Sequence, residues 1–360
     1  MSNLTNTMLM KRTHLLMTLV ALMALSINAF AQGPNNSGTY YAAADGKKGA
    51  ELKTALFAII KAGHTSNSYN SLWTHFRTTD ARADGKVWDM YSDITDFTFG
   101  TDQAGSYNKE GDVYNREHSF PNSWFGGSKS HIAYSDLHHL YPTDGYVNNR
   151  RANFAFGENN GESYQSWYRP ADPTKQPSEK GFSKLGTCTY AGSGGVTCFE
   201  PNDMYKGDFA RTYFYMVTRY EDEIVNWYNN YGMKEGVSET LDGNKYPGLT
   251  SWQLSMLMKW AENDPIDQPI AKETPRNEAV YGIQHNRNPF IDYPGLEQYI
   301  WGDFTDVAFS YDSYQVPTEI MTVREERPVE DNVMYNMAGQ VVDKSYKGIV
   351  IMNGRKYVNK

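Results

Sequence analysis

The pair Glu117-His118 has the residue types that acid–base chemistry at a phosphate requires. An imidazole titrates near neutral pH, so His118 could take a proton from water. Glu117 could give a carboxylate oxygen to a hard cation such as Mg²⁺, and the guanidinium of Arg116 could bind a phosphate. These residues predict hydrolysis of a phosphodiester bond, although a Glu-His pair taken alone is more often part of an ordinary surface.

A second group of polar residues follows in the string SDLHHLYPTDGYVNNRRAN. Asn148 could be an oxygen ligand of the same cation, or the cap of a turn or helix. Arg151 could hold a phosphate or belong to a solvated surface. His138 and His139 do not form a helical zinc motif, because adjacent residues share a face neither in a helix nor in a strand. We expect at least one of these two histidines to be structural.

Taken together, these strings resemble a known family. NREHSFPNSWFGG followed by SDLHHLYPTDGYVNNRRANFAFGE is similar to the bacterial endonuclease I family of ββα-metal, or His-Me finger, nucleases. FEPNDMYKGDFARTYFYMVTRY and RNEAVYGIQHNRNPFIDYP also look like family segments, so the resemblance covers roughly residues 38–302. It implies an α+β fold: a mixed helical nuclease domain with a ββα-metal motif, in which two strands and a helix surround one divalent cation.

The resemblance also implies roles for single residues. His118 would be the general base, Asn148 a metal ligand and Glu117 the second ligand, with Mg²⁺ the usual ion and Mn²⁺ or Ca²⁺ as other candidates. The products would carry 5′-phosphates. Arg151 matches the arginine of the family run and Arg116 precedes the Glu-His pair, so either could stabilise the phosphate and either could be structural.

Further residues are expected to support the site rather than to react. Asp136, His138 and Asn153 would orient the metal loop and its neighbours through hydrogen bonds. Because neighbouring strand residues face opposite sides, Glu117 and His118 could share a site only where the strand ends or bulges, and we predict such a distortion there.

The elements that must position these residues are predicted from hydrophobic periodicity. Apolar positions at three- and four-residue steps predict helices over residues 48–63, 207–231 and 250–262, the last with Thr-Ser caps. Residues 86–98 favour extended structure with turns, and residues 100–200 are rich in loops, which often carry function.

The N-terminus has the pattern of a secretory signal peptide over residues 1–31. Lys11 and Arg12 precede an apolar run over residues 15–27, and Ala29-Phe30-Ala31 fits the small-x-small cleavage rule. We therefore expect export, to the periplasm, the cell surface or the medium, and no membrane-spanning segment in the mature chain.

The C-terminus differs in character from the rest. The expected nuclease domain spans residues 32–310, a Pro-rich and charged linker spans 311–332, and a β-rich tail spans 333–360. Within the tail, Asn-Gly between two β-rich runs predicts a hairpin. The tail resembles the sorting tails of Bacteroidetes-type exported proteins, which implies contact with a secretion machinery; a small accessory β module is the alternative.

The formal net charge of −8 opposes nucleic-acid binding in general, so such binding would need a local basic patch. The two cysteines, Cys188 and Cys198, flank a Gly-rich turn and could form a disulfide in an exported protein or remain two buried thiols.

The first functional hypothesis is a monomeric, metal-dependent endonuclease that cuts DNA, and possibly RNA, with little sequence specificity. The alternatives are an extracellular ribonuclease and a non-catalytic surface protein that binds nucleic acid or glycan. The sequence shows no residue that contacts or rejects a 2′-hydroxyl, so it does not separate DNA from RNA.

Overall fold

The computed structural model describes residues 33–170, 172, 174–317, 334–336, 341–343, 345–352 and 355–359. The chain divides into two compact units, Met1–Val316 and Pro317–Lys360, which we call the larger and the smaller unit. The signal peptide expected over residues 1–31 lies outside the described residues. None of the helices in the described part of the chain has the length and apolar character that a membrane span requires.

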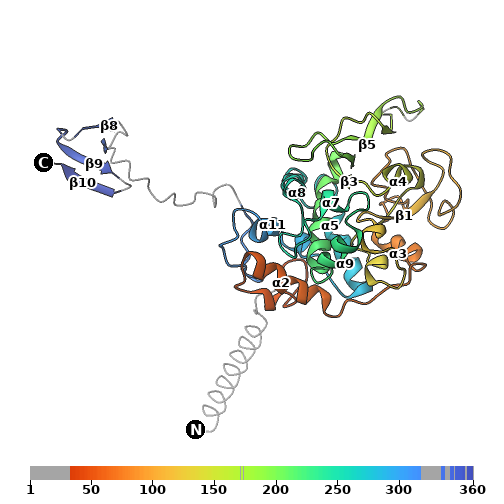
Figure 1. Ribbon diagram of the computed structural model, residues 1–360, viewed down its shortest axis with the longest axis horizontal. Coiled ribbons are helices and arrows are strands. Elements are labelled where there is room, and N and C mark those ends of the chain that lie inside the picture. The colour runs from red at the N-terminus through yellow and green to blue at the C-terminus, as the bar shows by residue number, and fades with distance from the viewer. Residues whose placement is uncertain are drawn as a thin grey trace, which may run out of the picture. The chain divides into compact units, whose positions relative to one another are not determined.

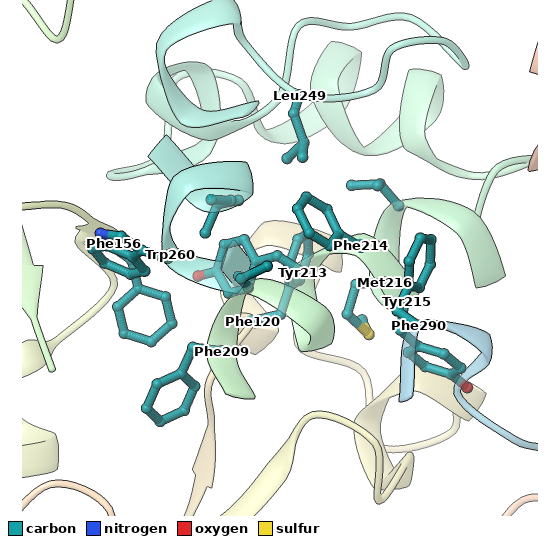
Figure 2. Packing of buried hydrophobic residues seen from close by; sticks show 14 of the residues in the cluster. Phe120, Phe156, Phe209, Tyr213, Phe214, Tyr215, Met216, Leu249, Trp260 and Phe290 are labelled. Carbon is teal, nitrogen blue, oxygen red and sulfur yellow. The ribbon is translucent and has the colours of Figure 1, made fainter. Parts of the chain in front are cut away.

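The larger unit is built around helix α5 (Lys206–Arg219), which lies in its middle (Figure 1). Every residue of α5 from Phe209 onward is buried, so the helix is covered on all sides. Figure 2 shows Phe209, Tyr213 and Phe214 of this helix within a cluster of aromatic and aliphatic side chains from several other elements. The core therefore forms around one helix rather than between two layers.

The helix predicted over residues 207–231 is two helices, α5 and α6 (Ile224–Tyr231). The chain turns between them, and the turn places Glu221 against the buried ammonium of Lys53, with 2.9 Å between Oε2 and Nζ. The hydroxyl of Tyr220 donates to Asp136 at 2.8 Å. These tertiary contacts end α5 where the helical periodicity alone predicted continuation.

The other helices surround α5 and include the two predicted at residues 48–63 and 250–262. Thr250 stands at the N-cap position of α8, but its hydroxyl donates to the carbonyl of Glu239 and does not cap the helix, contrary to expectation. The helices are α2 (Gly49–Lys61), α3 (Leu72–Thr79), α4 (Gly145–Arg151), α7 (Val237–Thr240), α8 (Ser251–Asn263), α9 (Glu273–Gln284), α10 (Pro289–Asp292) and α11 (Leu296–Ile300). Four short 3-10 helices are η1 (Ala42–Ala44), η2 (Asn122–Phe125), η3 (Ile132–Ser135) and η4 (Asp203–Tyr205).

Two sheets belong to the larger unit. The first is the antiparallel pair of β1 (Tyr114–His118) and β2 (Leu140–Asp144). The second has the order β3-β6-β5-β4, with β3 parallel to β6 and the other pairs antiparallel. Its strands are β3 (Ala155–Phe156), β4 (Tyr164–Trp167), β5 (Lys180–Thr187) and β6 (Thr197–Glu200).

Between these elements the chain runs mostly in loops, as expected for residues 100–200. Residues 86–98 form no strand; an isolated bridge joins Val87 to Ala81, and Met90, Tyr91 and Phe97 enter the core. Cys188 and Cys198 are buried and are free thiols in this structure, with no disulfide between them.

The smaller unit contains a sheet of order β10-β9-β7-β8. β9 (Gly348–Met352) and β10 (Arg355–Asn359) form the antiparallel hairpin that the Asn-Gly pair predicts, with Met352 opposite Arg355. The other strands are β7 (Met334–Asn336) and β8 (Val341–Val342). The molecule is thus a mixed α and β protein, in agreement with the predicted fold class at that level.

Candidate active site

A cavity of about 380 Å³ in the larger unit brings together most of the residues that the sequence singled out. β1 ends at this cavity and α4, which packs against both β1 and β2, forms part of its wall. Its lining residues are Tyr69, Trp73, Ala104, Asn115, Arg116, Glu117, His118, Pro121, Asn122, Asn148, Arg151, Ala152 and Asn153. Segments up to 84 residues apart in the sequence therefore meet at one place.

The strand that carries Glu117 and His118 has a regular register with no bulge, since Glu117 pairs with Tyr141 and His118 with Leu140. The strand ends at His118, so a strand end, and not a bulge, is the distortion found. The side chain of Glu117 contacts Tyr91 and that of His118 contacts Tyr134, as expected for opposite faces of a strand. Both residues nevertheless line the cavity. This geometry makes Glu117 a weaker candidate ligand than Asn148.

His118 is held in one tautomer by its surroundings. Its Nε2 lies 3.0 Å from the backbone carbonyl oxygen of Tyr134, which only accepts, so Nε2 carries the proton. Its Nδ1 is then the basic nitrogen, and the amide of Asn122 in the cavity wall donates to it at 3.3 Å. Burial, with a smaller contribution from His139, lowers the pKa of His118 to about 3. The ring is therefore neutral at neutral pH, and its lone pair on Nδ1, which accepts from Asn122, lies beside the cavity.

Glu117 is buried and is held by two groups behind the cavity. The hydroxyl of Tyr91 donates to Oε1 at 2.9 Å, and Nη1 of Arg151 lies 3.4 Å from the same oxygen. Burial raises the pKa of Glu117, and the charge of Arg151 opposes that rise. Oε1 is thus occupied within the protein, which leaves Oε2 as the oxygen that could hold a cation.

Asn148 lies on α4, half-buried at the cavity. The helix begins at this place because the carboxylate of Asp144 accepts from the backbone N–H of Val147 at 2.8 Å. The carboxylate of Asp89 in turn accepts from the N–H of Asp144 at 3.0 Å. Among the hydrogen bonds of the described residues none uses the side chain of Asn148, so its amide oxygen is available to a ligand.

The two candidate arginines have different environments. Arg151 is buried, and its guanidinium donates to the carbonyl oxygens of His118 at 3.3 Å and Ser119 at 2.7 Å. Arg116 is half-buried, and its Nη1 donates to the carbonyl oxygen of Tyr69 at 2.6 Å. Arg151 therefore stabilises the end of β1, whereas Arg116 has no carboxylate partner among the described residues.

The residues expected to support the site fall into two groups. Asn153 lines the cavity, but Asp136 and His138 do not. The buried carboxylate of Asp136 accepts from the hydroxyls of Tyr215 and Tyr220 and from the side-chain amide of Gln284. These hydrogen bonds join the segment between η3 and β2 to α5 and α9.

His138 and His139 are also buried away from the cavity, so both are placed in structural positions. The ring of His138 meets the carbonyl oxygen of Asn286 at 3.2 Å, and that of His139 meets the carbonyl oxygen of Ala133 at 2.6 Å. The ring of His139 lies 5.6 Å behind that of His118, between centroids.

Several site residues were not predicted from the sequence. Trp73 lies on α3 and Tyr69 in the turn before it, while Tyr91 comes from a loop and Asn122 begins η2. Asn122 stands in the family-like string around His118 and could have been found there. The others carry no local signal, because an aromatic residue such as Tyr69, 49 positions before His118, is brought to it only by the tertiary fold.

The donors at the cavity fit a hydrated Mg²⁺. No group of three or more histidine, cysteine, aspartate or glutamate side chains that could hold a metal occurs in the part of the chain that the structure describes. Mg²⁺ commonly takes one or two protein oxygens and keeps several waters. The amide oxygen of Asn148 and a carboxylate oxygen of Glu117 would supply such a set.

Comparison with known proteins places this arrangement in a family. The endonuclease I family matches residues 48–295. The extracellular ribonuclease of Bacillus amyloliquefaciens is 35% identical over 268 residues, which cover 73% of this chain and 78% of the relative. The extracellular ribonuclease of Bacillus subtilis (strain 168) is 35% identical over 286 residues, which cover 77% of this chain and 83% of the relative. This chain belongs to the endonuclease I family, a family of nucleases.

Proposed function

We propose that this protein is a secreted, divalent-metal-dependent endonuclease that hydrolyses phosphodiester bonds of nucleic acid with little sequence specificity. The observation that carries the proposal is the state of His118, whose Nε2–H is fixed on the carbonyl oxygen of Tyr134 so that the basic Nδ1 lies beside the cavity. A neutral, oriented imidazole is what a general base needs before its substrate arrives.

His118 begins the proposed reaction by taking a proton from water through Nδ1. The water oxygen attacks phosphorus, and the bond from phosphorus to the 3′ oxygen breaks. The products are a 5′-phosphate and a 3′-hydroxyl, whose oxygen takes its proton from solvent, and the imidazolium returns its proton to solvent. The Tyr134 carbonyl stabilises the imidazolium in the meantime through the retained Nε2–H hydrogen bond.

A divalent cation, Mg²⁺ first and Mn²⁺ or Ca²⁺ as alternatives, would supply positive charge to the phosphate and to the leaving oxygen. Asn148 would be its main protein ligand and Glu117 the second. Asp144 and Asp89 hold the helix that presents Asn148, and Tyr91 and Arg151 hold the carboxylate of Glu117.

The substrate is RNA or DNA. Both Bacillus relatives are named extracellular ribonucleases, which supports RNA, whereas the family name leaves DNA open. The names of the relatives also support export, as does the signal-peptide pattern of residues 1–31. We further propose that the protein is a monomer and that its C-terminal tail serves in sorting. A protein that only binds nucleic acid has no need of an oriented base at its cavity.

The experiment that tests the proposal compares hydrolysis of supercoiled plasmid and of RNA by the mature protein, with Mg²⁺ and then with EDTA. His118→Ala is expected to lose about 10²–10⁴-fold in rate. His75→Ala, a histidine on α3 that does not line the cavity, is the matched control and should keep the wild-type rate. Activity that survives EDTA would remove the metal from the proposal, and an active His118→Ala variant would remove the base.

A further inference from the structure

One face of β1 carries Tyr114, Arg116 and His118, because alternate residues of a strand point the same way. Trp73 of α3 and Tyr69, in the turn before α3, cover this face. Trp73 packs edge-on against Tyr114, with 5.5 Å between ring centroids. The ring of Tyr69 stacks on that of His118 at 5.8 Å, with 20° between the planes. Arg116 therefore lies between two aromatic residues, on the same side of the strand as the proposed base.

The guanidinium of Arg116 is held by these two rings. Its central carbon lies 3.6 Å from the ring centroid of Tyr69 and 4.3 Å from that of Trp73. The rings fix its orientation by stacking and cation–π attraction without using its N–H groups. Nη1 donates to the carbonyl oxygen of Tyr69, and no carboxylate of the described residues forms an ion pair with this guanidinium.

Three buried arginines of this protein are paired with carboxylates, whereas the buried Arg219 donates to Nδ1 of His64. Arg211 pairs with Glu273, Arg276 with Asp80 at 2.8 Å, and Arg287 with Asp292 at 2.7 Å. Arg116 has no such partner among the described residues, although it is half-buried in a cavity wall. Removing a cation from water is costly unless an anion compensates, so this environment is suited to an anion that arrives with a ligand.

A second cation lies near the same aromatic ring. The ammonium of Lys129, an exposed residue between η2 and η3, is 5.8 Å from the ring centroid of Tyr69. Lys129 likewise forms no ion pair within the described residues. Two unpaired cations thus lie around one ring, beside His118, in a protein whose net charge is −8. This is the local basic patch that nucleic-acid binding by an acidic protein requires.

We propose that Arg116 and Lys129, arranged around the ring of Tyr69, form a site for two neighbouring backbone phosphates of the substrate strand. The site rests on the proposed function, since it places the strand for attack at His118. Arg116 takes the phosphate nearer to the reacting one through Nη2 and Nε, and Lys129, which is exposed near the Tyr69 ring, takes the next phosphate. Arg151 is then a positioning residue for β1 and Glu117, not a phosphate ligand.

The test is equilibrium binding, which needs no metal and no turnover. A short fluorescein-labelled single-stranded RNA, and DNA of the same sequence, are titrated with protein in EDTA over a series of salt concentrations. Arg116→Gln and Lys129→Gln are each expected to weaken binding about threefold to tenfold at low salt. Each should also reduce the slope of log Kd against log salt by about 0.7, because one phosphate contact is lost.

Controls separate charge from structure. Lys259→Gln changes a lysine that lies 5.8 Å from the ring of Tyr190, the same cation-to-ring distance as in the proposed site, and it should leave affinity and slope unchanged. Arg116→Lys keeps the charge and should keep the slope while losing the fork. A purely structural role for Arg116 predicts a lower thermal midpoint for Arg116→Gln with the wild-type slope, and that result overturns the proposal.

Different results would contradict the proposed function and the phosphate site. A wild-type protein that neither binds nor cuts RNA or DNA contradicts the proposed function itself. A wild-type protein that binds and cuts, together with Arg116→Gln or Lys129→Gln variants that keep the wild-type salt slope, contradicts the phosphate site alone.

Discussion

Burial sets the protonation state of His118 before any substrate is bound. The pKa of the ring is lowered to about 3, so at neutral pH the histidine is a neutral imidazole with its one proton on Nε2. The same burial explains why the pair Glu117-His118 is not an ordinary surface pair. Both side chains are almost inaccessible from outside except through the cavity that they line.

At the residue scale, Arg151 and Arg116 show that one residue type can serve two purposes. Arg151 binds groups of the protein itself: it donates to the carbonyl oxygens of residues 118 and 119 and pairs with the carboxylate of Glu117. Arg116 is held by the π faces of Tyr69 and Trp73 and has no carboxylate partner among the described residues. From the sequence alone, both arginines were candidates for stabilising the phosphate, and their contacts in the structure distinguish them.

Arg151→Met is expected to reduce the free energy of unfolding by about 3–5 kcal/mol, because it leaves Glu117 as a buried carboxylate without its cation. Chemical denaturation measures this loss. Arg150→Met, an exposed neighbour on the same helix, is the matched control and should stay within about 0.5 kcal/mol of the wild type. An Arg151→Met variant as stable as the wild type would show that the guanidinium does not support β1 and Glu117.

At the element scale, the site depends on where a strand ends and where a helix begins. β1 ends at His118, and α4 begins after Asp144, whose carboxylate caps it. The helix is only seven residues long, so packing and capping must fix it. The buried carboxylate of Asp89 receives the N–H of Asp144 and ties the start of α4 to the loop over residues 86–98.

Glu110 links the loop before β1 to the second sheet. Its carboxylate accepts from the hydroxyls of Ser92 and Tyr164 and from the N–H of Trp167. Burial raises the pKa of Glu110 to about 7. Because the raised pKa favours the protonated form in the folded state, this group's contribution to stability is lost as the pH rises from about 4.5 through 7.

Glu110→Gln keeps the shape of the protonated form and removes the titration. The free energy of unfolding of the variant, relative to the wild type, is therefore expected to increase between pH 4.5 and pH 8. Urea unfolding at a series of pH values measures the difference. Glu51→Gln, an exposed glutamate on α2, should show a difference that does not change with pH. A flat difference for Glu110→Gln would contradict the buried-acid interpretation.

At the scale of the whole molecule, the acidic net charge and the proposed substrate are reconciled by the local cations of the cavity. All the residues that line the cavity belong to the larger unit. The smaller unit has its own four-stranded sheet. Catalysis and any role of the tail in sorting can therefore be tested separately.

A chain that ends at Val316 is expected to keep the wild-type rate of hydrolysis and a similar thermal midpoint, because no residue of the cavity is removed. Cleavage of RNA and plasmid, together with a melting curve, measures both. A shorter chain that also lacks α11 is the control, and it should melt well below the wild type because Leu296, Tyr299 and Ile300 are buried. Loss of most of the activity on truncation at Val316 would assign the smaller unit a part in catalysis.

The sequence by itself determined the family. The string around His118 and the run that contains Asn148 identified the candidate base and ligand, because those residue types are rare enough in that order to be specific. Helical periodicity also predicted α2, α8 and the helical segment that contains α5. These features follow from neighbouring residues alone.

The tertiary structure decided what surrounds those residues. The break between α5 and α6 follows from contacts of Tyr220 and Glu221 with residues more than 80 positions away. The placement of Tyr69 and Trp73 over Arg116, and of Tyr91 and Arg151 behind Glu117, likewise depends on distant segments meeting. The burial and pairing of charges depend on the folded packing and not on the order of residues. For that reason, only the structure distinguishes Arg116, which has no carboxylate partner among the described residues, from Arg151, which is bonded to groups of the protein itself.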